Sequence, residues 1–230
     1  YFNFLQQYSI EGLSKFRGDV DPRAFEVSND AYWQAYDAIA GRGGSYVGVG
    51  WGGQNESYLA HMHASEVLII DTNPYVVKVR MPIYGALAIL SRNRVEFISR
   101  LSGRPVSAEQ AEALDQKSFQ EIVEFFKREP FDDAAYLRTW PLIAELFPPE
   151  VRPRAEYAWR AMANDQRDDI VLRRAGAGYL DQQLQASTQG RQGWLASPDT
   201  YDYVRGLWLT GKIFNQSGFI TISSISMSTA

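Results

Sequence analysis

The sequence predicts a helix-rich α/β protein built on a Rossmann-like parallel sheet. Three observations support this fold class. A glycine-rich turn at residues 48–53 joins a short apolar segment to a helical one, a second apolar run at residues 67–70 ends in Asp71, and residues 107–210 are almost wholly helical in pattern. A strand, a glycine turn, a helix and a second strand form the first half of a cofactor-binding α/β unit. The other elements are therefore placed around residues 45–74.

Two helices are predicted before this segment. Apolar side chains recur at helical intervals over residues 2–16. Residues 30–40 form a second helical pattern, with Ser28 or Asn29 as its N-cap and the glycine cluster 41–44 as its end.

The central segment divides into strand, turn, helix and strand. Residues 46–49 are predicted to form the first strand and residues 54–64 a short helix. Residues 67–70 are continuously apolar, which is typical of a parallel strand buried on both faces of its sheet.

One long helix is predicted next, beginning at the Asn73–Pro74 pair, which suits the N-cap and the first helical position. Pro82 kinks or restarts this helix, and Gly103, followed by Pro105, ends it. Apolar residues between Ile83 and Leu101 form its buried side.

Residues 107–210 are predicted to form several further helices. Ser107 and Gln110 make a capping box, Ser197–Pro198 starts the last helix, and Gly211 ends it. The predicted apolar anchors are Phe119, Ile122, Val123, Phe126, Tyr136, Trp140, Ile143, Leu146, Tyr157, Trp159, Tyr201, Val204, Leu207 and Trp208.

The predicted strands are few for a doubly wound fold. Residues 219–230, rich in Ile, Ser and Thr, supply a third strand, whereas a complete sheet of this type has about five or more. Two interpretations stay open. Either residues 107–210 are a helical insertion or cap in a single α/β domain of residues 1–230, or the sequence is part of a longer protein.

Composition excludes several classes of protein. The 230 residues carry a net charge of −4, which argues against general nucleic-acid binding, and contain no cysteine, which excludes disulfides, thiolate nucleophiles and cysteine-bound metals. The longest apolar run, residues 81–90, is too short to span a bilayer. We expect a cytoplasmic protein without membrane association, although the first residue, Tyr1, leaves processing open. A small-molecule ligand is the expected partner, and a protein partner or a homo-oligomer stays open.

Gly48, Gly50 and Gly53 satisfy the pattern G-x-G-x-x-G. Glycine lets the backbone turn sharply from strand to helix and lets a ligand approach without meeting a side chain. Asp71 follows Gly53 by 18 residues, near the spacing at which a carboxylate accepts hydrogen bonds from ribose hydroxyls. These residues predict a pocket for a nucleotide or for S-adenosylmethionine (SAM). The alternative is a tight strand–helix turn in which Asp71 is an N-cap.

Other polar residues carry weaker predictions. The pair Gln54–Asn55 lies at the mouth of the turn and either binds a ligand or caps the helix. His61 and His63 would point about 200° apart on a helix, so they cannot bind one metal together. The adjacent pairs 132–133 and 168–169 are aspartates expected at helix starts or solvent-facing positions. No catalytic residue is assigned.

Residues 44–105 resemble a little-characterised bacterial family whose members carry a GVGxxQN turn, a strand ending in Asp, and a helix with an R-x-E-F-like segment. The segments FEVSNDAYW at 25–33 and SPDTYDYVRGLWLTGKI at 197–213 are also similar to that family. The family looks like a divergent branch of the SAM-dependent methyltransferases. The resemblance implies a methyltransferase-type Rossmann-like fold and SAM as cofactor. It carries over the glycine turn, Gln54, Asn55 and Asp71, and it matches Arg94, Glu96 and Phe97 to the later segment.

The chain also departs from this pattern. Typical methyltransferases have an acid two residues before the first glycine, where it helps to bind the methionyl part of SAM, and here that position is Tyr46. Three hypotheses follow: a SAM-binding, methyltransferase-like protein of unknown acceptor, a catalytically inactive Rossmann-like scaffold or ligand sensor, and an NAD- or FAD-dependent oxidoreductase. Tyr46 favours the scaffold or sensor.

Overall fold

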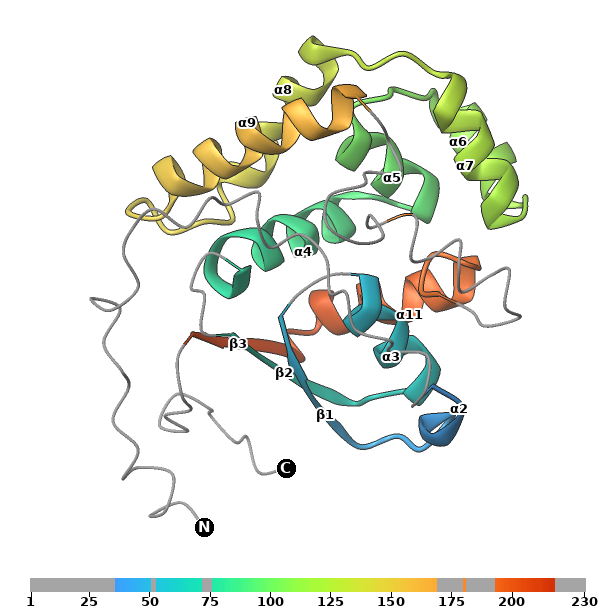
Figure 1. Ribbon diagram of the computed structural model, residues 1–230, viewed down its shortest axis with the longest axis vertical. Coiled ribbons are helices and arrows are strands. Elements are labelled where there is room, and N and C mark those ends of the chain that lie inside the picture. Colours follow the sequence, from blue (N-terminus) through green and yellow to red (C-terminus); the bar gives the residue numbers. More distant parts are fainter. Residues whose placement is uncertain (1–35, 51–52, 72–75, 169–179, 181–192, 218–230) are drawn as a thin grey trace.

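The protein is helix-rich and contains a small parallel sheet (Figure 1). The computed structural model describes residues 36–50, 53–71, 76–168, 180 and 193–217. The sheet has three strands in the order β1-β2-β3, which are β1 (Ser45–Val49), β2 (Glu66–Asp71) and β3 (Ile213–Ser217). Both strand pairs are parallel.

The first two strands and the helix between them follow the prediction. A short helix, α2 (Tyr36–Ile39), precedes β1, and α3 (Gly53–Met62) connects β1 to β2. The loop before β1 closes the C-terminus of α3, because the Gly41 N–H donates to the His61 carbonyl at 2.9 Å and the Gly43 N–H donates to the Met62 carbonyl at 2.7 Å. Glycine suits this loop, since both residues have a φ near +60°.

A long helical segment separates β2 from β3 in the chain. It contains a π-helix, η3 (Val76–Arg80), which continues into an α-helix. The α-helices are α4 (Met81–Leu90), α5 (Arg94–Ser102), α6 (Ala108–Asp115), α7 (Phe119–Arg128), α8 (Asp133–Ala144), α9 (Arg152–Asp168) and α11 (Pro198–Leu209). In Figure 1 the helices α4 to α9 lie above the sheet, with α4 between it and α8 and α9, and α11 lies beside α3.

Several predicted helix ends are confirmed. The Ser107 hydroxyl accepts the Gln110 N–H at 3.1 Å, and the Gln110 side chain accepts the Ser107 N–H, so the predicted capping box is formed. Ser197 caps α11 in the same way. Gly103 and Gly211 both adopt positive φ, 66° and 65°, just after α5 and α11. These helix boundaries are therefore set by capping residues and glycines at the ends of the helices themselves.

The prediction of one long helix up to Gly103 is wrong. The chain leaves the helix at Ser91, whose ψ is 133°, and starts again after Asn93, whose side chain accepts the Glu96 N–H at 2.9 Å. The end of α4 is satisfied from a distant part of the chain, because Arg205 Nε donates to the Ala88 carbonyl at 3.1 Å. A cationic donor at a helix C-terminus is favourable, and no local pattern shows it.

Two predicted anchors are also wrong, since Tyr157 is 61% exposed and Leu146 is 54% exposed. The third strand of the described sheet is β3, whereas a third strand was predicted at residues 219–230. Those residues, the predicted helix at 2–16 and the Asn73–Pro74 pair lie outside the described residues, as do residues 30–35 of the predicted second helix.

The main core lies on the helix-facing side of the sheet. Val67 and Ile69 of β2 are buried there, 1% and 0% exposed, against the helices. The opposite face is less buried within the described chain, because Leu68 and Ile70 are only half-buried and Val49 is 73% exposed. The prediction that this strand is buried on both faces is therefore wrong. The order β1-β2-β3 moves in one direction, and right-handed crossovers then place the described connecting helices on the same face.

Among the helices of the described ranges, none has the length and apolar character needed to cross a membrane.

Candidate functional site

The predicted ligand-binding residues meet at the carboxyl edge of the sheet, where β1 and β2 end. Gly50 follows β1 directly and has a φ of +71°, a conformation that costs other residues about 1 kcal/mol or more. Its N–H donates to the Ile70 carbonyl at 3.0 Å, so the β1–β2 pairing runs to the start of the turn. Gly53 begins α3, and the two residues between them lie outside the described part of the chain.

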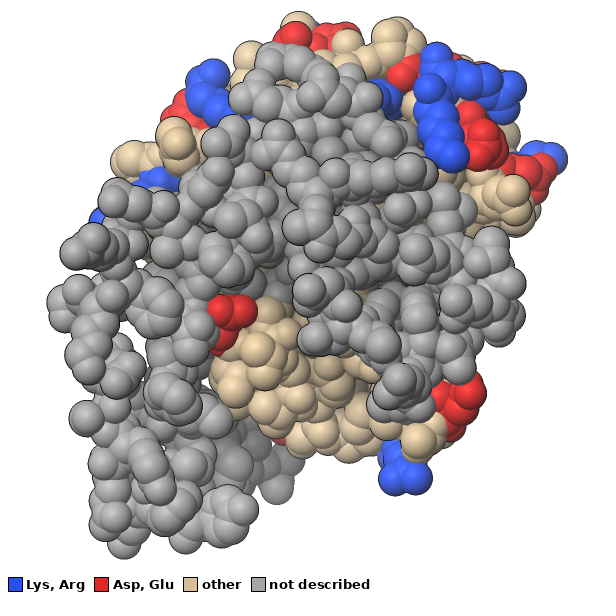
Figure 2. All heavy atoms as spheres, viewed as in Figure 1, with Lys and Arg blue, Asp and Glu red and all other residues tan. Residues whose placement is uncertain are grey.

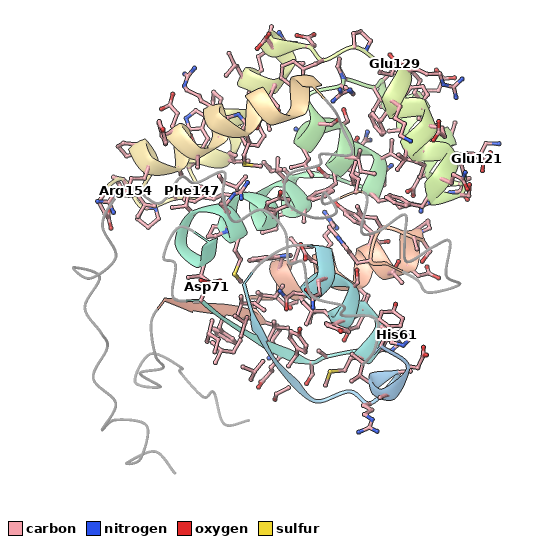
Figure 3. All side chains as sticks on the ribbon, in the orientation of Figure 1. His61, Asp71, Glu121, Glu129, Phe147 and Arg154 are labelled. Carbon is pink, nitrogen blue, oxygen red and sulfur yellow. The ribbon has the colours of Figure 1, made fainter. Side chains whose placement is uncertain are left out.

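Asp71 lies beside this turn as the last residue of β2, at the left end of the sheet in Figure 3. Its Oδ2 is 3.4 Å from the point where a Cβ on Gly50 would lie. Sequence reasoning placed the carboxylate near the turn, and the structure brings the two together. In parallel α/β sheets ligands bind at this edge, outside the carboxyl ends of the strands.

Asn55 binds the protein's own backbone. It is 4% exposed, and its Nδ2 donates to the carbonyls of Gly50 at 3.0 Å and Val49 at 3.4 Å. Its Oδ1 accepts the Tyr46 hydroxyl at 2.7 Å. Asn55 therefore ties the end of β1 to the first turn of α3. Gln54, beside it, is half-buried.

Gly48 makes room for this arrangement. A Cβ there would lie 2.3 Å from Asn55 Oδ1 and 2.6 Å from the Tyr46 ring, closer than atoms can approach. Tyr46 thus lies across Gly48, and glycine is required at this position by the chain's own side chains. Burial raises the pKa of the Tyr46 hydroxyl, and the neighbouring Tyr58 and Glu56 raise it further, so the hydroxyl stays protonated as a donor.

Sequence reasoning missed two residues of this region. From the sequence, Tyr46 is only a departure from the methyltransferase pattern. In the structure its hydroxyl donates to Asn55, so Tyr46 helps to hold the turn in place. Glu56, in the first turn of α3, is 1% exposed. A buried carboxylate is favoured near a helix N-terminus, and the polar tripeptide at residues 55–57 directly after a glycine turn was the available signal.

Both histidines pack against aromatic rings. His61 stacks on Tyr36 with the ring centroids 3.6 Å apart, and burial lowers the pKa of His61. His63 stacks on Tyr203 at 5.2 Å. Within the described ranges no cluster of metal-binding side chains is present.

The aspartate pairs were expected at helix starts or solvent-facing positions. Asp132 caps α8, because its side chain accepts the Ala135 N–H at 2.9 Å. The side chains of the pair 168–169 lie outside the described part of the chain.

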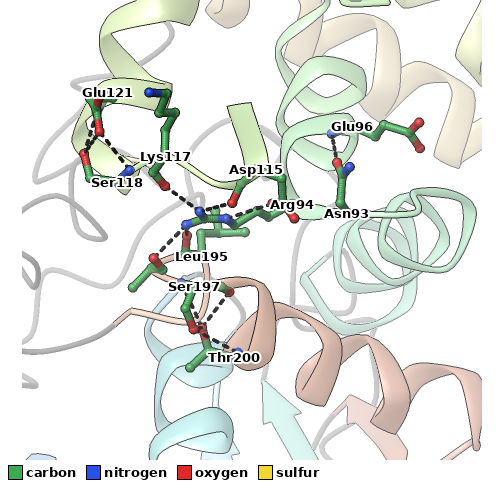
Figure 4. Close-up of polar contacts among 11 residues, drawn as sticks. Asn93, Arg94, Glu96, Asp115, Lys117, Ser118, Glu121, Leu195, Ser197 and Thr200 are labelled. Carbon is green, nitrogen blue, oxygen red and sulfur yellow. Dashed lines mark hydrogen bonds and ion pairs between the residues drawn. The ribbon is translucent and has the colours of Figure 1, made fainter. Parts of the chain in front are cut away.

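Arg94, from the segment matched by resemblance, joins three distant parts of the chain (Figure 4). It is 1% exposed, and its Nε donates to Asp115 Oδ1 at 2.9 Å. Its Nη1 donates to the carbonyls of Leu195 at 2.8 Å and Ala196 at 2.6 Å, and its Nη2 donates to those of Asp115 and Lys117, both at 2.7 Å. Every guanidinium nitrogen is satisfied within the protein, so Arg94 has a structural role.

The other two matched residues are placed as follows. Phe97 is buried against Trp194, with the ring centroids 5.0 Å apart. Glu96 is half-buried, and its carboxylate accepts the Arg92 side chain at the start of α5. The segment therefore fixes the packing of α5. The turn itself differs from GVGxxQN, because three residues separate Gly50 from Gln54.

Comparison with known proteins gives one family. A search of curated proteins found no match. The model of a domain of unknown function, DUF7790, matches residues 26–229, which include the glycine turn, Asp71 and all described helices and strands. The chain therefore belongs to the DUF7790 domain family.

Proposed function

We propose that the protein binds SAM at the carboxyl edge of its sheet and is methyltransferase-like, with an acceptor still to be identified. One observation carries this proposal: the Asp71 carboxylate lies next to the backbone of Gly50. In a nucleoside site of this type, a strand-end carboxylate accepts the ribose hydroxyls while the glycine backbone approaches the ligand.

The surrounding elements support the same proposal. The order β1–α3–β2 with parallel pairing supports the proposal, because a methyltransferase-type Rossmann-like unit would begin with the same order. The first turn of α3, at Gly53 and Gln54, has N–H groups without partners in the helix ladder, and such groups suit polar or anionic ligand atoms. In this proposal Gly50, Gly53, Gln54 and Asp71 line the cofactor, with Asn55 supporting the turn from behind.

The chemistry fits a site without an acid–base set. Gly50, Gly53, Gln54 and Asp71 would hold SAM, which would supply an activated methyl group for transfer to the acceptor. Such a reaction depends mainly on positioning the two reactants. We assign no catalytic residue.

Isothermal titration of the full chain with SAM, S-adenosylhomocysteine, NAD and FAD tests the proposal. We expect SAM and S-adenosylhomocysteine to bind with Kd values in roughly the micromolar range. Asp71→Asn should weaken this binding about tenfold or more, because the ribose loses a charge-assisted acceptor. Glu66→Gln is the matched control at the opposite end of the same strand, and it should leave the affinity unchanged.

The other outcomes decide between the hypotheses. Binding of NAD or FAD alone would indicate the oxidoreductase. Equal SAM affinity in the wild type and Asp71→Asn would remove Asp71 from the site. If none of the four ligands binds, the SAM proposal fails.

A second function, a catalytically inactive scaffold or ligand sensor, is favoured by Tyr46. Its ring and the Asn55 side chain fill the space over Gly48. A site built for the methionyl group would keep a carboxylate at position 46 and open space beside the glycine. The scaffold hypothesis predicts a stably folded protein that binds none of the four ligands.

A further inference from the structure

A small pocket lies where α5, the loop after it and α8 meet. Helix α5 contributes Glu96, Ser99 and Arg100 to its lining, and α8 contributes Ala135 and Thr139. The pocket has a volume of about 180 Å³, slightly more than the roughly 150 Å³ of a cavity that holds benzene. None of the residues proposed to bind the cofactor lines it, so an inference about this pocket does not depend on the proposed function.

Arg100 is the cation of this pocket. Among the described residues its guanidinium takes part in no ion pair. Its Nε is buried and has no hydrogen-bond acceptor within the described chain. The last turn of α5 is a favourable place for a positive charge, but it supplies no acceptor for this nitrogen. A buried donor without an acceptor is costly, and a ligand with a suitable oxygen removes that cost.

Glu96 lines the same pocket, but its carboxylate is paired with Arg92. Glu96 Oε1 accepts Arg92 Nε at 2.8 Å, and Oε2 accepts the Arg92 backbone N–H at 2.9 Å. Burial by itself would raise the pKa of Glu96, but the hydrogen bonds from Arg92 and the charges of Arg92 and Arg100 outweigh it and lower the pKa, so Glu96 stays ionised. In Figure 4 the Glu96 side chain points away from Arg94. These charges together leave one positive charge, on Arg100.

The hydroxyl groups of the lining donate inside the protein. Ser99 Oγ donates to the Arg104 carbonyl at 2.8 Å, and Thr139 Oγ1 donates to the Ala135 carbonyl at 3.3 Å. Within this lining, Arg100 is therefore the side-chain donor that remains for a ligand.

The surface as a whole offers anions no comparable attraction. The net charge of the chain is −4. In Figure 2 the Lys and Arg side chains near α6 and α7 lie beside Asp and Glu side chains. Charges of mixed sign do not make a broad positive field, so affinity for an anion has to come from a specific site.

We propose that this pocket binds a small monocarboxylate whose carboxylate pairs with Arg100. The planar guanidinium matches the two oxygens of a carboxylate. Pro105, Val106 and Ala135 supply apolar lining for a short hydrocarbon part. A carboxylate balances the one positive charge, whereas a phosphate carries close to two negative charges at neutral pH and would place the excess beside Glu96.

A saturation-transfer NMR titration of the full chain at constant ionic strength tests the proposal. The probes are sodium butyrate, its neutral analogue butyramide, and inorganic phosphate. We expect butyrate to bind with a Kd of about 1 mM or lower. Butyramide and phosphate should bind about tenfold or more weakly, because the first lacks the charge and the second carries too much of it.

Four variants connect the affinity to the pocket. Arg100→Gln should weaken butyrate binding about tenfold or more, whereas Glu96→Gln should strengthen it about threefold or more, because a negative charge beside the ligand is removed. Ala135→Leu should abolish binding by filling the pocket without changing its charge. Arg160→Gln is the matched control, since this arginine is 58% exposed on α9 and pairs with Glu156, and it should leave the Kd unchanged.

Several results would overturn the proposal. They are no butyrate binding by the wild type up to about 20 mM, a concentration well above the expected Kd, equal affinity for butyrate and butyramide, tighter binding of phosphate than of butyrate, and the same Kd in Arg100→Gln as in the wild type. Circular dichroism and urea midpoints check that each variant is folded. If Arg100→Gln does not fold, the opposite effects expected of Glu96→Gln and Ala135→Leu still decide the question.

Discussion

Replacing Arg94 should destabilise the protein strongly, and the structure allows the size of the effect to be worked out. The guanidinium makes five hydrogen bonds, one to the Asp115 carboxylate and four to backbone carbonyls. Arg94→Ala leaves that carboxylate without its cation in a site where Asp115 is 8% exposed. Breaking a buried ion pair by removing one partner costs about 3–5 kcal/mol. We therefore expect Arg94→Ala to lower the free energy of unfolding by about 4 kcal/mol.

The variant Arg94→Lys tests whether the positive charge alone or the arrangement of the guanidinium hydrogen bonds stabilises the fold. A lysine ammonium keeps the charge but has its three donors on a single nitrogen, whereas the guanidinium reaches acceptors in two separate parts of the chain, residues 115–117 and 195–196. Losing two or more hydrogen bonds to buried carbonyls should cost about 2 kcal/mol. The control is Arg92→Ala, which removes the ion pair to Glu96 from a side chain that is 60% exposed. Exposed pairs of this kind contribute little to stability because solvent screens them.

Urea denaturation followed by tryptophan fluorescence measures these differences, since Trp194 lies next to the Leu195 and Ala196 carbonyls that Arg94 binds. The expected order of stability is wild type, Arg92→Ala, Arg94→Lys and Arg94→Ala. If Arg94→Lys and Arg92→Ala were equally stable, the multidentate role of Arg94 would be refuted.

Three further predictions concern the turn and the histidines. Gly48→Ala should lower the free energy of unfolding by about 2 kcal/mol, because its Cβ would overlap Asn55 and the Tyr46 ring and force them to shift; equal urea midpoints for variant and wild type would contradict the overlap. Tyr46→Phe should cost about 1–2 kcal/mol in the same assay, because Asn55 Oδ1 loses its donor in a buried site; an unchanged midpoint would show that water replaces the hydroxyl. Burial lowers the pKa of His61 in the folded protein, so folding favours its neutral form. Its contribution to stability is therefore present above about pH 6.5, the pKa of an unfolded histidine, and is lost as the pH falls below that value. His61→Gln should therefore reduce the loss of stability between roughly pH 7 and pH 5, with His63→Gln as the control, and parallel pH profiles for wild type and His61→Gln would exclude this contribution.

Short-range patterns explain the elements that were predicted correctly. A capping box, a glycine after a helix, or a strand–turn–helix segment is encoded within about ten residues, and its energetics are local. For this reason the capping box at Ser107, the helix start at Ser197 and the glycine ends at Gly103 and Gly211 follow the prediction.

The predictions that failed depend on residues far apart in the chain. The break at Ser91 is stabilised by Arg205, more than 100 residues later, and no window of sequence shows that contact. Tyr157 has the residue type of a core anchor, but it lies on the side of α9 that no other element covers within the described chain, and it is exposed.

At the candidate site, sequence alone determined that a glycine turn and a strand-end acid lie on neighbouring parallel strands, because the order strand, turn, helix, strand brings those ends together. Only the tertiary structure decided what surrounds them. Tyr46 and Asn55 meet over Gly48 through a hydrogen bond whose partners are nine residues apart. The strand order likewise decided that, among the described residues, one face of the sheet is buried and the other is more exposed. Burial depends on which elements pack together in space, and a one-dimensional pattern does not contain that information.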